Sequence, residues 1–158
     1  MNSKGFTLIE LVVVIVILGI LAVTAVPKYI NLQADARTAT LEGVKAAMQV
    51  ASVLVYSKSL VAGNQKLSSS NNPKPIITLS DGTELDINYG YPTPAILDWR
   101  SILDLDSNDF EMTKTTSNVL IIYPASLGIV FSDNTDCIVT YQQATSTVKR
   151  IITVKPCV

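Results

Sequence analysis

The sequence predicts an α+β protein in which one long N-terminal helix packs against an antiparallel β-sheet. An apolar stretch over residues 6–27 continues into an amphipathic pattern that reaches about residue 62. Short segments rich in Val, Ile and Tyr follow, and turn residues separate them. Because the connections between these segments are short, antiparallel pairing is favoured.

The first half of the expected helix is apolar on all sides. Residues 5–26 read GFTLIELVVVIVILGILAVTAV, after a leader that contains Lys4. About 20 apolar residues are enough to cross a bilayer. Glu10 is the single acid in this stretch, and a charge at mid-membrane costs about 2.5–3.5 kcal/mol, less near an end. Glu10 is therefore a candidate functional residue.

Three interpretations compete for this N-terminus. A cleaved secretory signal needs a shorter apolar core, although residues 22–25 loosely fit a small-residue cleavage site. A plain signal anchor, with Lys4 held on the cytoplasmic side, explains everything except Gly5-Phe6 and Glu10. The string GFTLIEL at residues 5–11 resembles the processing motif of type IV prepilins, and this interpretation accounts for all of these residues.

The resemblance implies a specific chemistry at the N-terminus. A membrane peptidase would cut between Gly5 and Phe6 on the cytoplasmic face, and the new amine of Phe6 would be N-methylated. The Glu of the family that matches Glu10 supports methylation and docking into the filament. A carboxylate in hydrocarbon seeks a cationic partner, so we expect Glu10 of one subunit to pair with the Phe6 amine of the next.

The second half of the expected helix, residues 28–62, is amphipathic. An apolar stripe recurs at three- and four-residue steps and predicts a helix face buried against a domain; its members are Leu41, Val44, Met48, Ala51 and Val55. Pro27 would ordinarily end or kink a helix, and Gly63 is a natural stop. Gly19 and Pro27 bracket the stretch in which family members are thought to lose helix on assembly, so we expect flexibility there, with simple kinking as the alternative.

Residues 63–158 are expected to form a globular head. Segments 76–79 and 84–87 flank Asp81-Gly82, which predicts a β-hairpin. A rigid turn at 90–94 leads into a short helix, about 94–105, that Thr93 can cap. The later predicted strands are 119–123, 128–131, 137–141 and 148–154.

This arrangement agrees with the type IV pilin fold, and the turn GYPTP at 90–94 also resembles the mannose-sensitive haemagglutinin pilins, a subgroup of type IVa pilins. Tyr89, Tyr91 and Trp99 cluster around this turn. Core packing is favoured for them over sugar stacking.

Two cysteines, Cys137 and Cys157, allow a single intramolecular pairing. An exported domain meets an oxidising compartment, which favours a disulfide, and two buried thiols are the alternative. The spacing also resembles the C-terminal disulfide-bounded loop of many type IV pilins.

The residue content argues against an enzyme and against bound cofactors. The chain has no histidine, so the commonest general base is absent. Asp104, Asp106 and Asn108 imitate the start of a calcium loop, but Asp109 stands where glycine is needed and Thr115 where a bidentate glutamate belongs. We therefore expect a solvated loop at Asp104–Asp109 and no metal. A net charge of −1 gives no electrostatic footprint for nucleic acid.

The resemblance implies a structural subunit of a type IV pilus, a surface filament for adhesion or motility. Its expected partners are copies of itself, the prepilin peptidase and N-methyltransferase, the assembly platform with its motor ATPases, minor pilins and, before assembly, the bacterial inner membrane. A pseudopilin of a type II secretion system is the main alternative, against which the two cysteines argue. A lone membrane-anchored binding or sensing domain is the third class.

Overall fold

The computed structural model describes residues 6–130 and 132–158, without the side chains of residues 26–31. The expected leader with Gly5 therefore lies outside the described residues, as does the side chain of Pro27. The order of elements is α1 (Leu8–Ala62), β1 (Ile76–Thr78), β2 (Glu84–Asn88), β3 (Tyr91–Pro92), α2 (Ile96–Ile102), β4 (Phe110–Lys114), β5 (Leu120–Pro124), a 3₁₀ turn (Ala125–Leu127), β6 (Ile138–Gln142) and β7 (Ile151–Lys155).

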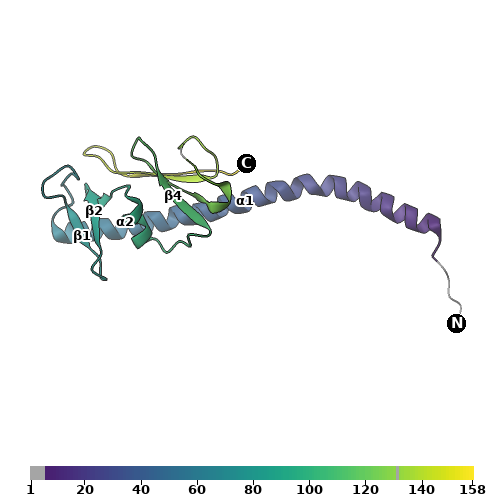
Figure 1. Cartoon of the computed structure of the whole chain (residues 1–158), viewed down its shortest axis with the longest axis horizontal. Coiled ribbons are helices and arrows are strands. Elements are labelled where there is room, and N and C mark those ends of the chain that lie inside the picture. The colour runs from purple at the N-terminus through teal and green to yellow at the C-terminus, as the bar shows by residue number, and fades with distance from the viewer. Residues whose placement is uncertain (1–5, 131) are drawn as a thin grey trace.

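Helix α1 gives the molecule its shape. Its second half lies along the sheets of the head, and its first half projects away as a long arm (Figure 1). Thr7 caps the first turn from an extended backbone conformation. At the other end Gly63 adopts a left-handed conformation, φ +72°, and its N–H donates to the carbonyls of Ser59 and Leu60. The predicted long helix is thus confirmed, with Gly63 as its stop.

The head contains two antiparallel sheets, one in the order β1-β2-β3 and one in the order β4-β5-β6-β7. In the second sheet Met112, Ile122, Val139 and Val154 stand opposite one another across all four strands. This apolar row faces α1, whereas Ile121 and its neighbours on the other face form a separate small cluster. The α+β prediction is confirmed.

The main core joins α1 to the four-stranded sheet and to α2. The predicted stripe on α1 is buried, and Trp99 and Tyr141 are its largest partners, with rings in edge-to-face contact at 4.6 Å between centroids. Trp99 Nε1 donates to the carbonyl of Thr93 at 2.9 Å, and the Tyr141 hydroxyl donates to the carbonyl of Pro92 at 2.5 Å. The polar ends of both rings therefore fix the segment between β3 and α2.

Three details of the head differ from the sequence prediction. Helix α2 begins later than predicted because Ala95, not Thr93, is its N-cap, and the Thr93 carbonyl is taken by Trp99. Residues 128–130 are not a strand, since a 3₁₀ turn leads into Gly128 at φ +73°; Phe131 lies outside the described residues. The strands also differ, because β3 and β4 were not predicted and β7 begins at Ile151 instead of residue 148.

Candidate functional site

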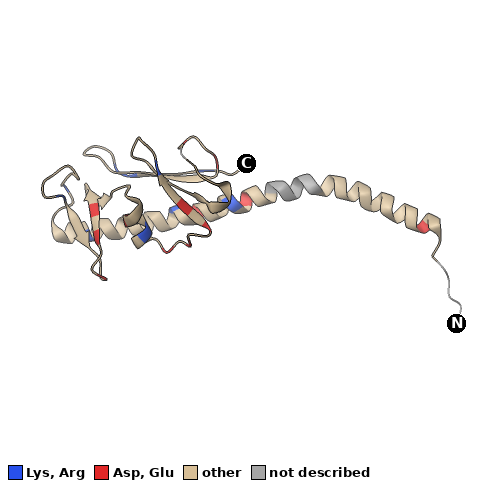
Figure 2. Cartoon of the chain, in the orientation of Figure 1, with Lys and Arg blue, Asp and Glu red and all other residues tan. Residues whose placement is uncertain are grey.

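The arm of α1, Leu8–Ala25, is an apolar rod that no other described part of the chain covers. Its large apolar side chains from Phe6 to Val23 are between 47% and 82% exposed. By length and composition, Leu8–Ala25 is the one helical segment within the described residues that could cross a membrane. Figure 2 shows one acidic position near the start of the arm and an otherwise uncharged ribbon up to the grey stretch. Such a surface calls for lipid or for other apolar helices.

Glu10 lies in the first turn of this rod and forms a capping box with Thr7. The Glu10 Oε2 atom accepts from the Thr7 backbone N–H and from the Thr7 hydroxyl, both at 2.8 Å, and Glu10 N–H donates to Thr7 Oγ1 at 3.3 Å. Sequence reasoning missed Thr7, although the Thr-x-x-Glu spacing before an apolar run is the signature of this motif. Among the described residues, Glu10 Oε1 accepts no hydrogen bond, so half of the carboxylate is open to a second partner.

The surroundings of Glu10 are apolar. Phe6, Ile9, Val13 and Val14 share its helix face and, with Glu10, line a shallow hollow of about 320 Å³. The carboxylate is thus presented beside side chains that another apolar helix can contact. Phe6 and Glu10, which the sequence predicts to act together, lie on one face and one turn apart. Gly19 lies further along the same helix, and a Cβ added there would meet nothing within 4 Å.

Cys137 and Cys157 form a disulfide that closes the C-terminal part of the head. The bond joins the start of β6 to the segment after β7, and Cys137 N–H donates to the carbonyl of Pro156 at 3.0 Å. Cys157 N–H donates to Thr38 Oγ1 on α1 at 2.9 Å. The disulfide therefore also anchors the C-terminus to the base of the arm.

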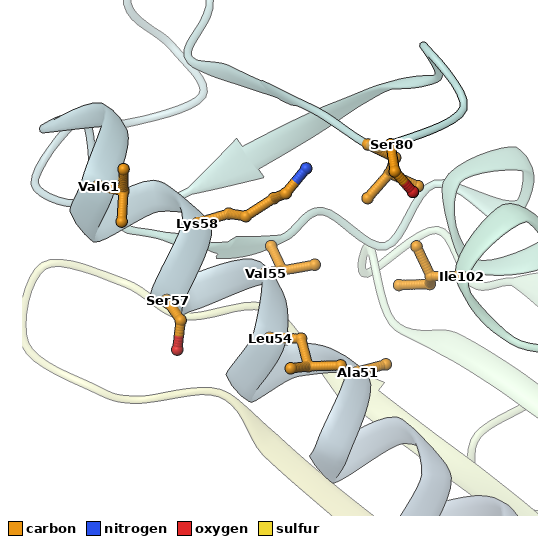
Figure 3. Close-up of a pocket in the computed structure, with 9 residues that line it drawn as sticks. Ala51, Leu54, Val55, Ser57, Lys58, Val61, Ser80 and Ile102 are labelled. Atoms are coloured by element: carbon orange, nitrogen blue, oxygen red, sulfur yellow. The ribbon is translucent and has the colours of Figure 1, made fainter.

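An apolar groove of about 550 Å³ lies where the end of α1 meets the β1–β2 hairpin and α2. Figure 3 shows Leu54, Val55 and Ile102 at this groove and the Lys58 side chain reaching toward the hairpin. Lys58 Nζ donates to the carbonyl of Thr78 at 2.6 Å. Lys58 is the single ionisable group among the described lining residues, so the groove offers no acid–base pair.

The acidic loop at Asp104–Asp109 is a surface turn. Asp106 Oδ1 accepts from the backbone N–H and from the side-chain amide of Asn108, both at 2.8 Å, which is a local turn motif. Asp104, Asp106 and Asp109 are exposed. Within residues 6–130 and 132–158 no group of three or more His, Cys, Asp or Glu side chains is placed to hold a metal ion.

Comparison with protein families agrees with this geometry. Residues 1–26 match the family model of the prokaryotic N-terminal methylation motif. The match covers the expected leader, the capping box and the arm as far as Val26. It describes the N-terminal segment and does not extend to the head.

Comparison with curated proteins gives relatives among pilins. The chain is 49% identical over 51 residues to the type IV narrow pilus major component PilA5 of Thermus thermophilus, 32% of this chain and 44% of that protein. It is 34% identical over 87 residues to a fimbrial protein of Pseudomonas aeruginosa, 55% and 49% of the two chains. It is 40% identical over 75 residues to the type IV major alpha-pilin of Moraxella bovis, 46% and 47% of the two chains.

Each of these matches spans less than half of the relative's length. No solved structure gave a significant match. The methylation motif and the named relatives support a type IV pilin. They do not confirm the mannose-sensitive haemagglutinin subgroup.

Proposed function

We propose that this chain is a structural subunit of a type IV pilus that polymerises through the arm of α1. The observation that carries the proposal is the exposed apolar rod, which has one acid, Glu10, in the capping box of its first turn and which contains the N-terminal methylation motif. Burying a large apolar side chain contributes about 1.5–3 kcal/mol, so bundling of arms can hold a filament together without catalytic groups in the chain. The heads then coat the bundle.

The proposal divides the chain into four parts. Residues 1–5 are a leader that the prepilin peptidase removes, and Phe6 becomes the N-methylated first residue. Residues 6–27 span the inner membrane before assembly and form the filament core afterwards. Residues 28–62 continue the helix into the head, and residues 63–158 complete the head. Extraction of the arm from lipid opposes assembly, so an assembly platform with motor ATPases and minor pilins are the further partners of this proposal, and its end point is an extracellular filament.

The capping box refines the proposed role of Glu10. In the single chain Thr7 donates two hydrogen bonds to Oε2, while Oε1 accepts none among the described residues and Glu10 lines the hollow with Phe6 and Val13. In the filament the open oxygen would accept from the methylated amine of a neighbouring Phe6. The carboxylate of Glu10 would thus accept hydrogen bonds from Thr7 of its own helix and from the Phe6 amine of a second subunit at the same time. Gly19 and Pro27 bracket the proposed stretch in which α1 loses helical structure during assembly.

The test compares Glu10→Ala with Glu42→Ala in cells that carry the assembly machinery. Glu42 is an acid of the same helix, exposed and 3.1 Å from Lys45. Glu10→Ala is expected to leave membrane insertion intact and to abolish or strongly reduce surface filaments, while Glu42→Ala assembles normally. Electron microscopy scores the filaments, and mass spectrometry of the subunit checks for an N-methylated Phe6 at its start. Normal filaments from Glu10→Ala, or a mature chain that begins at Met1, contradict the proposal.

The Thr7→Ala variant separates the two proposed duties of Glu10. It removes the hydroxyl partner but leaves the carboxylate for a neighbouring amine. Loss of an N-cap costs about 0.5–2 kcal/mol of helix stability, so filaments are expected to form and to dissociate at a lower temperature. Complete loss of filaments in Thr7→Ala would show that the capping box, not the pairing, is the essential function of the motif.

A further inference from the structure

A cleft of about 460 Å³ lies on the head, away from the arm and its hollow beside Glu10. Three segments that are distant in sequence build it: the end of α1 with the turn after it, the connection between β2 and β3, and the loop between β6 and β7. Its lining comprises Tyr56, Gln65, Lys66, Tyr89, Tyr91 and residues 144–149. The volume falls in the range of small-molecule sites, about 300–1,000 Å³.

The walls of this cleft are fixed by interactions among the three segments. Tyr56 and Tyr91 stack with their centroids 4.8 Å apart, and the Arg150 guanidinium lies 4.8 Å from the centre of the Tyr91 ring. Asn88 is buried and ties the loops together. Its Oδ1 accepts from Ser69 N–H at 2.7 Å and its Nδ2 donates to the carbonyl of Ala144 at 2.8 Å.

The backbone at the centre of the cleft is strained. Tyr89 has a φ of +49°, which is uncommon for a residue with a side chain. At the next residue, Gly90, φ is +82° and an added Cβ would lie 2.7 Å from Tyr56 Cδ2, so glycine is required there. Strain of this kind concentrates at binding sites, where the surrounding structure holds it. Tyr89 also has no stacking or cation–π partner among the described residues, which leaves its ring available to a ligand.

The charge and an unpaired polar atom of the cleft indicate the class of ligand. Lys66 and Lys149 line it, and no acidic residue is among its described lining residues, although the whole chain carries a net charge of −1. One of the lining residues, Gln65, has a buried side-chain oxygen, Oε1, that lacks a hydrogen-bond partner within the part of the chain that the structure describes. This oxygen can accept from a hydroxyl.

We propose that this cleft binds a sugar unit that carries a carboxylate. The Tyr89 ring contacts the sugar face, Gln65 and the hydroxyls of residues 145–147 exchange hydrogen bonds with its hydroxyls, and Lys66 and Lys149 hold the carboxylate. A nucleic acid is disfavoured because its affinity depends on many phosphate contacts along an extended basic surface, whereas this cleft offers two lysines. Binding does not require a filament, so it can be measured on the monomeric chain whatever the outcome of the assembly experiments.

The experiment uses the full chain in detergent micelles and three probes: trigalacturonic acid, the neutral galactotriose and a short single-stranded DNA. Calorimetric titration gives the affinities. The Lys66→Gln/Lys149→Gln double variant is compared with Lys114→Gln, an exposed lysine at the end of β4. A third variant, Tyr89→Asn, removes the ring but keeps a residue that tolerates a left-handed backbone.

Trigalacturonic acid is expected to bind more tightly than galactotriose, and added salt weakens its binding. The double lysine variant should bind at least about fivefold more weakly, the effect of losing charge-assisted hydrogen bonds, and Lys114→Gln should bind as the unmodified chain does. Tyr89→Asn should also weaken binding while its melting temperature stays at or above that of the unmodified chain. Equal affinity for the neutral trisaccharide, tighter binding of the DNA, or no binding of trigalacturonic acid at millimolar concentration overturns the proposal.

Discussion

Removing the disulfide is expected to destabilise the head by an amount set by the loop that it closes. Cys137 and Cys157 are 20 residues apart, and cross-linking a loop of this length stabilises a fold by about 3 kcal/mol in the chain-entropy estimate. For a head of about 100 residues, each 1 kcal/mol moves the melting temperature by about 4–8 °C. Reduction, or the Cys137→Ala/Cys157→Ala variant, should therefore lower the melting temperature by about 12–24 °C.

The structure also predicts which strand loses stability first when the disulfide is removed. Strand β7 is an edge strand that, among the described strands, pairs with β6 alone, and its residues are partly buried or exposed. The disulfide and the bond from Cys157 N–H to Thr38 hold its far end against α1. Amide exchange of β7 should therefore accelerate before that of β5, which is buried over most of its length.

The assay is thermal unfolding of the full chain in detergent, followed by circular dichroism with and without a reductant, with hydrogen exchange read by mass spectrometry. The double variant is its own control, since a reductant should not change its melting temperature. A fall of less than about 4 °C on reduction, equivalent to no more than 1 kcal/mol, would refute this account of the disulfide.

Three further predictions concern the head. Tyr141→Phe leaves the buried carbonyl of Pro92 without its donor and should lower the free energy of unfolding by about 1–3 kcal/mol, measured by denaturant titration. Gly90→Ala places a Cβ 2.7 Å from the Tyr56 ring at a positive φ, so it should destabilise the head and disturb the near-ultraviolet spectrum of the tyrosines. Burial raises the pKa of Asp98 above its ordinary value of 3.8; because the folded chain then holds this proton more tightly than the unfolded chain, the contribution of Asp98 to stability falls as the pH rises from below 3.8 through the raised pKa.

Each of these predictions has a matched comparison. Tyr123→Phe removes a hydroxyl from a buried tyrosine for which no hydrogen bond is found within the described residues, and it should change stability less than Tyr141→Phe does. Gly82→Ala tests a positive φ without a steric neighbour, so its effect should be smaller than that of Gly90→Ala. Asp98→Asn cannot titrate and should lack the fall with pH. Equal effects within any of these pairs would contradict the reasoning.

The elements with a strong sequence period were predictable, and those that depend on tertiary contacts were not. The stripe from Leu41 to Val55 and the stop at Gly63 predicted the second half of α1 because burial and the left-handed cap are both local signals. Strand β4 was not predicted because Glu111, Thr113 and Lys114 interrupt its apolar residues. Its pairing with β5 decides its conformation. Conversely, Ile129 and Val130 have strand-forming side chains, but Gly128 before them has a positive φ, and Val130 packs on the sheet beside Ile121 without adding a strand.

The candidate sites also divide into those with a local sequence signal and those that depend on tertiary contacts. The motif at residues 5–11 is contiguous, so Phe6 and Glu10 were identified from the sequence alone. The cleft around Tyr89 draws its walls from segments up to about 90 residues apart, and its stacking with Tyr56 required knowledge of how the β2–β3 turn lies against α1. Helix α2 illustrates a smaller limit, since the sequence predicts a short helix and only the structure shows which side chains face the core, with Trp99 buried and Leu97 exposed.

The point at which the head begins to pack against α1 has a consequence for how the sequence can evolve. Among the described residues before Leu41 none is buried, and Thr38 makes the first contact with the C-terminus. A fragment that starts near residue 33 should therefore fold by itself as a water-soluble unit, without detergent. Substitutions in the rod and in the remainder of the molecule are then energetically independent, so in the proposed filament the surface of the head can diversify while the sequence of the rod stays the same.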